Sequence, residues 1–207
     1  MSRLSRLSRL FRLRPQALST ALLLAVVLAG CQKQLPPPSS PPPPPPVRGL
    51  RGLKQDVAAG RCAEALPGLD ALVRQLPDSA EAFLLLGLCN AKQNNPERAE
   101  AALSRAASLD PNNPRPLEAL GILRYGQKQY SAARDAFTRA VALGSTNAQT
   151  YYYLGNLDMQ AGHCPQALDN YRKAMAKDPA YRDASSEYRA AAAACAKPGM
   201  GGGSGKP

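Results

Sequence analysis

The stretch Ala80–Tyr181 repeats one pattern three times with a period of 34 residues, as Ala80–Asn113, Pro114–Asn147 and Ala148–Tyr181. Small residues recur at three positions of the period, which hold Gly87, Gly121 and Gly155; Ala99, Ala133 and Ala167; and Ala106, Ala140 and Ala174. Large apolar residues recur at three others, which hold Phe83, Leu117 and Tyr151; Leu86, Leu120 and Leu154; and Leu103, Phe137 and Tyr171. Such a period constrains the chain to stack copies of one small unit.

Each copy contains two amphipathic helical windows of about 13 residues, a usual length for globular helices. Short polar breaks divide the windows at Gln93–Asn95, Gln127–Gln129 and Gly162–His163. The glycine and alanine positions allow the two helices to approach closely, and the large apolar residues fill the remaining space. Because neither helix can bury its apolar face alone, the pattern predicts an all-α solenoid of helical hairpins.

This pattern resembles the tetratricopeptide repeat (TPR), whose period is 34 residues and whose signature combines Leu-Gly, two alanines, an aromatic and a closing Pro. The resemblance covers about half of the chain. Pro111 and Pro179 close the first and third copies, whereas Ser145 stands at that place in the second. Three residues after the Gly, where the family usually has Tyr or Leu, the chain has Asn90, Arg124 and Asp158.

Two flanking segments extend the predicted array. Residues 48–79 are interpreted as a degenerate TPR-like hairpin, with Leu50, Leu53 and Val57 as the apolar stripe of its first helix. Residues 182–197 are rich in alanine and resemble the extra helix that caps the C-terminal end of TPR arrays. Residues 198–207 are rich in glycine and are predicted to be disordered.

The N-terminal 30 residues are predicted to be an export signal. A basic segment, Ser2–Arg14, precedes an apolar run, Ala17–Leu28, that is short for a membrane span. The following Leu28-Ala29-Gly30-Cys31 resembles the lipobox of bacterial lipoproteins. That resemblance implies cleavage before Cys31 and acylation of the new terminus, which gives stable membrane attachment when several acyl chains are present. A non-cleaved anchor with an accidental cysteine is the alternative.

The residues after the lipobox predict which membrane holds the anchor and how far from it the repeats lie. Gln32 stands where a retained inner-membrane lipoprotein has Asp, so the resemblance implies an outer-membrane anchor that faces the periplasm. In residues 31–47, nine of the eleven residues from Pro36 to Pro46 are proline, which predicts a polyproline II tether. At about 3.1 Å per residue the tether would hold the repeats roughly 35 Å from the membrane. Recognition by an SH3-like module is the alternative role.

The net charge of the chain indicates which classes of partner it is expected to bind. The formal net charge is +11, and removal of the five arginines of the signal leaves +6. This surplus favours anionic lipid, cell-wall polymer or an acidic partner, and an ordinary soluble surface is the alternative. Nucleic acid is not expected, because no basic face with interleaved aromatic residues is present.

Four cysteines follow Cys31, namely Cys62, Cys89, Cys164 and Cys195. An exported chain meets an oxidising compartment, which favours two disulfides. In a TPR stack the start of one second helix lies beside the end of the following first helix, so the resemblance implies the pairs Cys62–Cys89 and Cys164–Cys195. Free buried thiols remain an alternative, as does zinc bound by His163 and Cys164, although the ligands are too few for a metal site.

The sequence contains no pattern of an enzyme. His163 is the only histidine, and no catalytic serine box, phosphate loop or paired-carboxylate arrangement is present. Asp135, Asp158 and Asp169 are interpreted as solvated helix charges. No catalytic residue, cofactor or small-molecule substrate is therefore predicted.

In TPR arrays the first helices of successive repeats line a concave binding groove. Transferred to this chain, the groove positions are Leu84, Leu88, Lys92, Arg115, Glu118, Ile122, Tyr125, Gln149, Tyr152, Asn156, Met159 and Gln160. Tyr125, Tyr152 and Met159 are large adaptable groups typical of contact hot spots, but they could equally cover a neighbouring helix. The carboxylate clamp of chaperone-binding TPRs needs Lys and Asn where this chain has Leu84 and Leu88.

These observations indicate a lipid-anchored TPR scaffold that binds another envelope protein. The first hypothesis is a pilotin-like factor, similar to TPR lipoproteins that assist the assembly of pilus or secretion secretins. The second is an adaptor for peptidoglycan synthases or hydrolases, suggested by the long tether and the basic residues near the first helix. A redox enzyme is disfavoured, because the chain has no Cys-x-x-Cys pair.

Overall fold

A computed structural model describes residues 49–196, and within this range every regular element is a helix. The elements in chain order are α2 (Leu50–Ala58), α3 (Cys62–Gln75), α4 (Ala80–Lys92), α5 (Pro96–Leu109), α6 (Pro114–Gly126), α7 (Tyr130–Ala142), α8 (Ala148–Gln160), α9 (Cys164–Lys177) and α10 (Arg182–Cys195). The predicted signal, Cys31, the tether and the glycine-rich tail lie outside the described residues. None of the described helices is long and apolar enough to cross a membrane.

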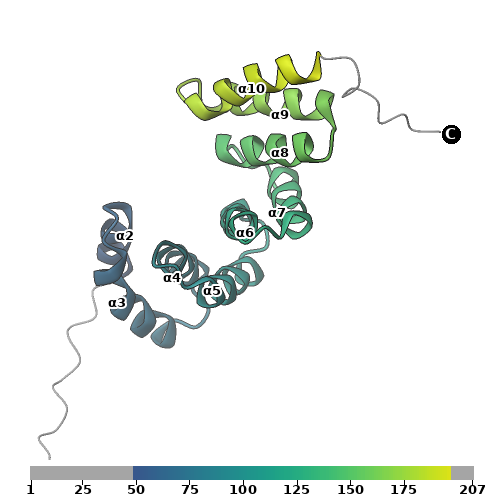
Figure 1. Ribbon diagram of the computed structural model, residues 1–207. Coiled ribbons are helices and arrows are strands. Elements are labelled where there is room, and N and C mark those ends of the chain that lie inside the picture. Colours follow the sequence, from purple (N-terminus) through teal and green to yellow (C-terminus); the bar gives the residue numbers. More distant parts are fainter. Residues whose placement is uncertain (1–48, 197–207) are drawn as a thin grey trace, which may run out of the picture. The chain divides into compact units, whose positions relative to one another are not determined.

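The helices follow one another as antiparallel pairs, with α4 against α5, α6 against α7 and α8 against α9 (Figure 1). Each pair meets at the repeated glycine. A Cβ atom on Gly121 would lie 2.5 Å from Cε1 of Phe137, and one on Gly155 would lie 2.6 Å from Cε1 of Tyr171. Both rings are almost fully buried. The predicted all-α solenoid is confirmed, and the glycines let a large side chain of the second helix reach the first.

The α2–α3 hairpin makes its closest contact at a different glycine. Leu53 occupies the glycine position of the period and is 1% exposed. Its partner helix supplies the small residue, because a Cβ atom on Gly68 would lie 2.7 Å from Cδ2 of Leu53. Gly68 of the second helix explains how a copy without the signature glycine still closes its hairpin.

The turn inside each hairpin has one conformation in all four copies. Gly60, Asn94, Lys128 and Gly162 occupy the same place in the period, and their φ angles are 79°, 57°, 61° and 74°. The next backbone N–H reaches back to the last turn of the first helix, as Asn95 N does to Asn90 O at 2.9 Å. This left-handed C-terminal cap satisfies carbonyl groups that the helix leaves open.

Asp158 is not the solvated charge that the sequence suggested. Its side chain is 5% exposed, and it accepts hydrogen bonds from Arg134 at 2.6 Å and Asn170 at 2.8 Å. The prediction was wrong because this face of α8 meets α7 of the preceding copy rather than water. Asp135 and Asp169 are exposed, as expected.

One copy earlier, the same two positions form an ion pair of opposite polarity. Arg124 of α6 lies 2.8 Å from Glu100 of α5, where the later copy has Asp158 and Arg134. The equivalent residue in α4, Asn90, is fully buried and donates to the carbonyl of Leu86 at 2.9 Å. Two of the three polar residues that depart from the TPR signature, Arg124 and Asp158, therefore pair across the contact between successive copies.

Two disulfides fasten the ends of the array. Cys62 at the start of α3 is bonded to Cys89 of α4, with their Cα atoms 4.9 Å apart. Cys164 at the start of α9 is bonded to Cys195 at the end of α10, with their Cα atoms 5.8 Å apart. Each bond joins a second helix to the helix that follows it.

Candidate peptide-binding groove

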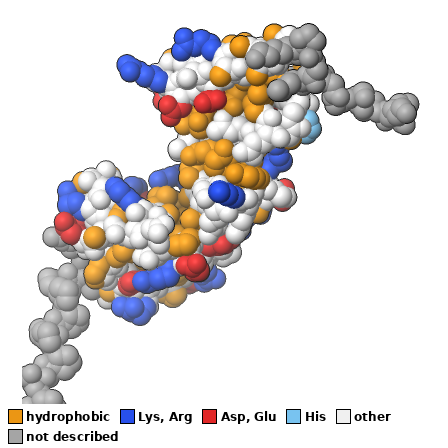
Figure 2. Space-filling model, in the orientation of Figure 1, with side chains coloured by type: hydrophobic (Ala, Val, Ile, Leu, Met, Phe, Trp, Pro, Cys, Tyr) orange, Lys and Arg blue, Asp and Glu red, His pale blue; other side chains and the backbone are white. Residues whose placement is uncertain are grey.

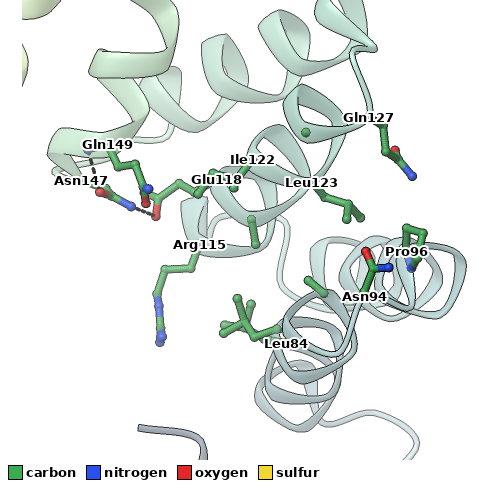
Figure 3. Close-up of a pocket in the computed structure, with 14 residues that line it drawn as sticks. Leu84, Asn94, Pro96, Arg115, Glu118, Ile122, Leu123, Gln127, Asn147 and Gln149 are labelled. Atoms are coloured by element: carbon green, nitrogen blue, oxygen red, sulfur yellow. Dashed lines mark hydrogen bonds between the residues drawn. The ribbon is translucent and has the colours of Figure 1, made fainter. Parts of the chain in front are cut away.

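A cavity of about 580 Å³ lies between α4, α6 and the start of α8 (Figure 3). We refer to it as the α4–α6 groove. Its lining residues are Leu84, Leu88, Ala91, Asn94, Pro96, Arg115, Glu118, Ala119, Ile122, Leu123, Gly126, Gln127, Asn147 and Gln149. Three successive copies thus contribute to one cavity, as expected where first helices of a repeat array face a common surface.

The middle of the groove is apolar. Leu84 and Leu88 project from α4, and Ile122 and Leu123 from α6. Leu84 is only 2% exposed and packs on the core formed with Leu103 and Leu117, so the floor is held rigidly. Hydrophobic side chains gather in the middle of the molecular face in Figure 2, around the place of α6 and α7 in Figure 1. This floor suits aliphatic side chains of a ligand.

Both ends of the groove are polar. Figure 3 shows Arg115, Asn147 and Gln149 at one end, and Asn94 with Gln127 at the other. Arg115 is exposed in the first turn of α6, and no ion pair to its guanidinium is present among the described residues. Amide side chains can both donate to and accept from a peptide backbone. The groove therefore offers an apolar centre between two hydrogen-bonding ends.

The acidic residue of the groove lining, Glu118, makes hydrogen bonds within the protein. Glu118 is 8% exposed, and its carboxylate accepts hydrogen bonds from the Ser145 hydroxyl and from Asn147 Nδ2, the latter at 3.1 Å. The Asn147 side chain also caps α8 by accepting from Gln149 N at 3.0 Å. Ser145, which replaces the closing proline of the other copies, therefore supplies the donor that fixes Glu118 at the groove wall.

The position of the cavity depends on two small residues. Ala91 of α4 and Ala119 of α6 face this space. One repeat later the equivalent residues are Tyr125 and Tyr153, whose ring centroids lie 4.7 Å apart between α6 and α8. Tyr153 also stacks on Phe137, with 5.5 Å between centroids. The two alanines leave a space between α4 and α6, whereas the two tyrosine rings fill the equivalent space between α6 and α8.

Six of the predicted groove residues line this cavity: Leu84, Leu88, Arg115, Glu118, Ile122 and Gln149. The other six do not: Lys92, Tyr125, Tyr152, Asn156, Met159 and Gln160. Lys92 instead donates to the carbonyl of Gly60 at 3.4 Å, toward the first hairpin. The sequence-based reasoning missed Asn94 and Gln127, because it transferred positions from first helices only and left out the turns.

Two of these six residues, Asn156 and Met159, line a smaller cavity of about 280 Å³ between α8 and α10. It is the equivalent of the α4–α6 groove two repeats later. Asn156 replaces Leu88, Ala190 replaces Ile122, and α10 stands where a further first helix would stand. The capping helix thus covers the part of the predicted surface around Asn156 and Met159.

The wall of this second cavity is a hydrogen-bonded tyrosine. The Tyr171 hydroxyl donates to Asn156 Oδ1 at 2.7 Å. Burial raises the pKa of Tyr171 above its usual range, and nearby Glu187 acts in the same direction. Tyr152 packs beside this ring, with 6.2 Å between centroids, so it fulfils the alternative role of covering a neighbouring helix.

The fold and groove define a class of protein: a stack of helical hairpins that presents a binding surface to a peptide or protein. The chain matches the tetratricopeptide repeat family model over residues 55–114 and 118–179. The chain belongs to the tetratricopeptide repeat family, whose members mediate protein–protein interaction.

Several individual proteins are similar to this chain over part of its length. Peroxisome biogenesis protein 5 of Arabidopsis thaliana is 35% identical over 74 residues, which is 36% of this chain and 10% of that protein. The chain spans about a third or less of the curated relatives it matches. Pseudomonas aeruginosa pilF has a TM-score of 0.63 at 20% identity, over 70% of this chain and 66% of that one. The first TPR of Spaghetti (RPAP3), bound to the HSP90 peptide SRMEEVD, has a TM-score of 0.54 at 21% identity, over 57% and 94%.

Proposed function

We propose that this protein is an exported, lipid-anchored scaffold that captures another envelope protein in the α4–α6 groove. The observation that carries the proposal is the groove itself, with an apolar floor and two polar ends. The lipobox-like Leu28-Ala29-Gly30-Cys31 supports export and attachment to a membrane. The proline-rich residues up to 47 would set the distance between the repeats and that membrane. The protein works by holding a rigid binding face at a set distance from the lipid surface.

Within this class, we propose a pilotin-like role in the assembly of a pilus or secretion secretin in the outer membrane. Gln32 after the acylated cysteine favours outer-membrane sorting, and a short TPR array on a lipid anchor suits a factor that escorts one partner. The likeness to Pseudomonas aeruginosa pilF agrees with this proposal through the fold alone.

Anchoring is tested by growing cells with labelled palmitate and separating their membranes. The chain should carry the label and sediment with the outer membrane, whereas the Cys31→Ala variant should carry none. Unlabelled wild-type protein in the soluble periplasm would refute the anchor.

The assembly role is tested by deleting the gene and measuring the heat-stable secretin multimers of the outer membrane. Multimers should fall in the deletion strain and return with the wild-type gene. An Ala119→Tyr variant, which places in the groove the residue found one repeat later, should reach the membrane but restore no multimers. Normal multimers without the protein would reject the secretin role, and co-purification of a peptidoglycan synthase or hydrolase would then support the adaptor role.

A further inference from the structure

The chemistry of the α4–α6 groove limits what it can hold, and this inference rests on the function proposed for the same groove. The lining runs along α6 from Arg115 to Gln127. At 1.5 Å per residue of helix this length is about 18 Å. An extended chain advances about 3.3 Å per residue, so the groove accommodates a segment of roughly five residues.

The polar groups at the two ends of the groove indicate whether a bound segment ends inside the groove or continues through it. Amide groups lie at both ends, from Asn94 and Gln127 on one side and from Asn147 and Gln149 on the other. A buried chain terminus would need one closed end, whereas backbone that continues through the groove needs hydrogen-bonding groups at both. The arrangement therefore fits an internal segment that enters and leaves through polar ends.

The charges at one end favour an acidic side chain. Arg115 is exposed at the groove wall, in the first turn of α6, where the helix dipole is also positive. Glu118 is the only other charged residue of the lining. Its two oxygens already accept from Ser145 and Asn147, so this carboxylate is held at the groove wall, whereas the guanidinium of Arg115 has no ion-pair partner among the described residues. A carboxylate beside Arg115 would form a charge-assisted hydrogen bond.

We infer that the α4–α6 groove binds an extended internal segment of a partner protein that has two aliphatic side chains spaced two residues apart and, two residues beyond them, an aspartate or glutamate, because alternate side chains of an extended chain share one face. The aliphatic side chains lie on Leu84, Leu88 and Ile122. The carboxylate lies on Arg115. The amides of the two ends hold the flanking backbone.

The experiment measures fluorescence anisotropy of labelled peptides with the purified, oxidised full chain. The probe is a peptide blocked at both termini, with two leucines spaced two residues apart and one glutamate two residues further on, so that all three side chains share a face of the extended chain. A second blocked peptide has glutamine in place of the glutamate. A third ends in a free carboxylate directly after the leucines. The blocked acidic peptide should bind about tenfold more tightly than its glutamine counterpart, since a hydrogen bond between charged groups is stronger than one that involves a neutral amide.

Three variants separate the parts of the inference. Arg115→Gln should remove the preference for glutamate and leave the affinity for the glutamine peptide unchanged. Arg139→Gln, on an exposed arginine of α7 outside the groove, should change neither affinity. Ala119→Tyr should abolish binding of all peptides, with the helical circular dichroism spectrum retained.

Each contrary result has one meaning. Equal binding of the glutamate and glutamine peptides overturns the acidic preference but leaves groove binding in place. Tighter binding of the free-carboxylate peptide shows that the occupant is a chain terminus and overturns the internal segment. Undiminished binding to the Ala119→Tyr variant places the ligand elsewhere and overturns the proposed function as well.

Discussion

The guanidinium of Arg134 lies 2.6 Å from the carboxylate of Asp158, across the contact between the second and third full repeats. One repeat earlier the same positions carry Glu100 and Arg124, at 2.8 Å and with opposite signs. A stack shifted by one repeat would place Asp158 against Glu100, and like charges in contact repel. The alternating polarity therefore favours one order of stacking among hairpins whose apolar patterns are nearly the same.

Loss of the buried carboxylate should destabilise the array. Asp158→Ala removes the acceptor of both Arg134 and Asn170 and is expected to lower the free energy of unfolding by about 2 kcal/mol. Urea unfolding followed by circular dichroism measures the effect. Asp169→Ala is the matched control, because its pair with Lys173 is half-exposed on one helix and should contribute less than about 0.5 kcal/mol. Equal effects of the two substitutions would contradict a special role for Asp158.

Glycine at the hairpin contact should be required for packing. Gly121→Ala is expected to cost about 1–3 kcal/mol, since the new Cβ would meet the Phe137 ring at 2.5 Å. Alanine favours helix over glycine by about 1 kcal/mol, so the loss must come from overpacking. Gly126→Ala on the same helix has no neighbour within 4 Å of the new Cβ and should be neutral or stabilising. A stabilised Gly121→Ala protein would show that the helices do not need this close approach.

The shared turn conformation makes an unusual prediction for Lys128. Its φ of 61° is left-handed, which costs a lysine roughly 1 kcal/mol, and its side chain is exposed. Lys128→Gly should therefore raise the free energy of unfolding by up to about 1 kcal/mol. Asn94→Gly should gain less, because asparagine tolerates this conformation better. Thermal unfolding of the two variants checks the order, and a destabilised Lys128→Gly protein would contradict the assigned backbone.

The two disulfides should contribute similar stability. Their cysteines are 27 and 31 residues apart, so loop-closure entropy predicts about 3.5 kcal/mol for each. Cys62→Ser with Cys89→Ser removes one bond, and Cys164→Ser with Cys195→Ser removes the other. Peptide mapping without reductant should recover these two linked pairs. Recovery of the crossed pairs would refute the connectivity.

The parts of the fold that could be predicted are those determined by size and period. Gly121 opposite Phe137 follows from the period alone, because each copy places a small residue where its partner helix has a large one. The all-α solenoid required nothing further. The burial of Asp158 could not be predicted in this way, since a single copy does not show which face of a helix meets the preceding copy.

The groove was predicted only in part for a related reason. Positions transferred from the family identify the helices that face it, and Leu88 and Ile122 were found in this way. Whether space remains between two helices depends on the residues that could fill it. Ala91 and Ala119 leave a cavity between α4 and α6, whereas Tyr125 and Tyr153 fill the equivalent space one repeat later. That α10 covers the surface around Asn156 could also be recognised only from the three-dimensional arrangement of the helices.

Capture of a partner in the α4–α6 groove is the central property proposed for this protein. Its most direct test places a photo-crosslinking amino acid at position 122 of the full chain in living cells, with the equivalent position 190 as the matched control. Light should join an envelope protein to the chain at position 122 and not at position 190, and Ala119→Tyr should abolish the adduct. The same adduct at both positions, or one that persists with Ala119→Tyr, would contradict binding in this groove.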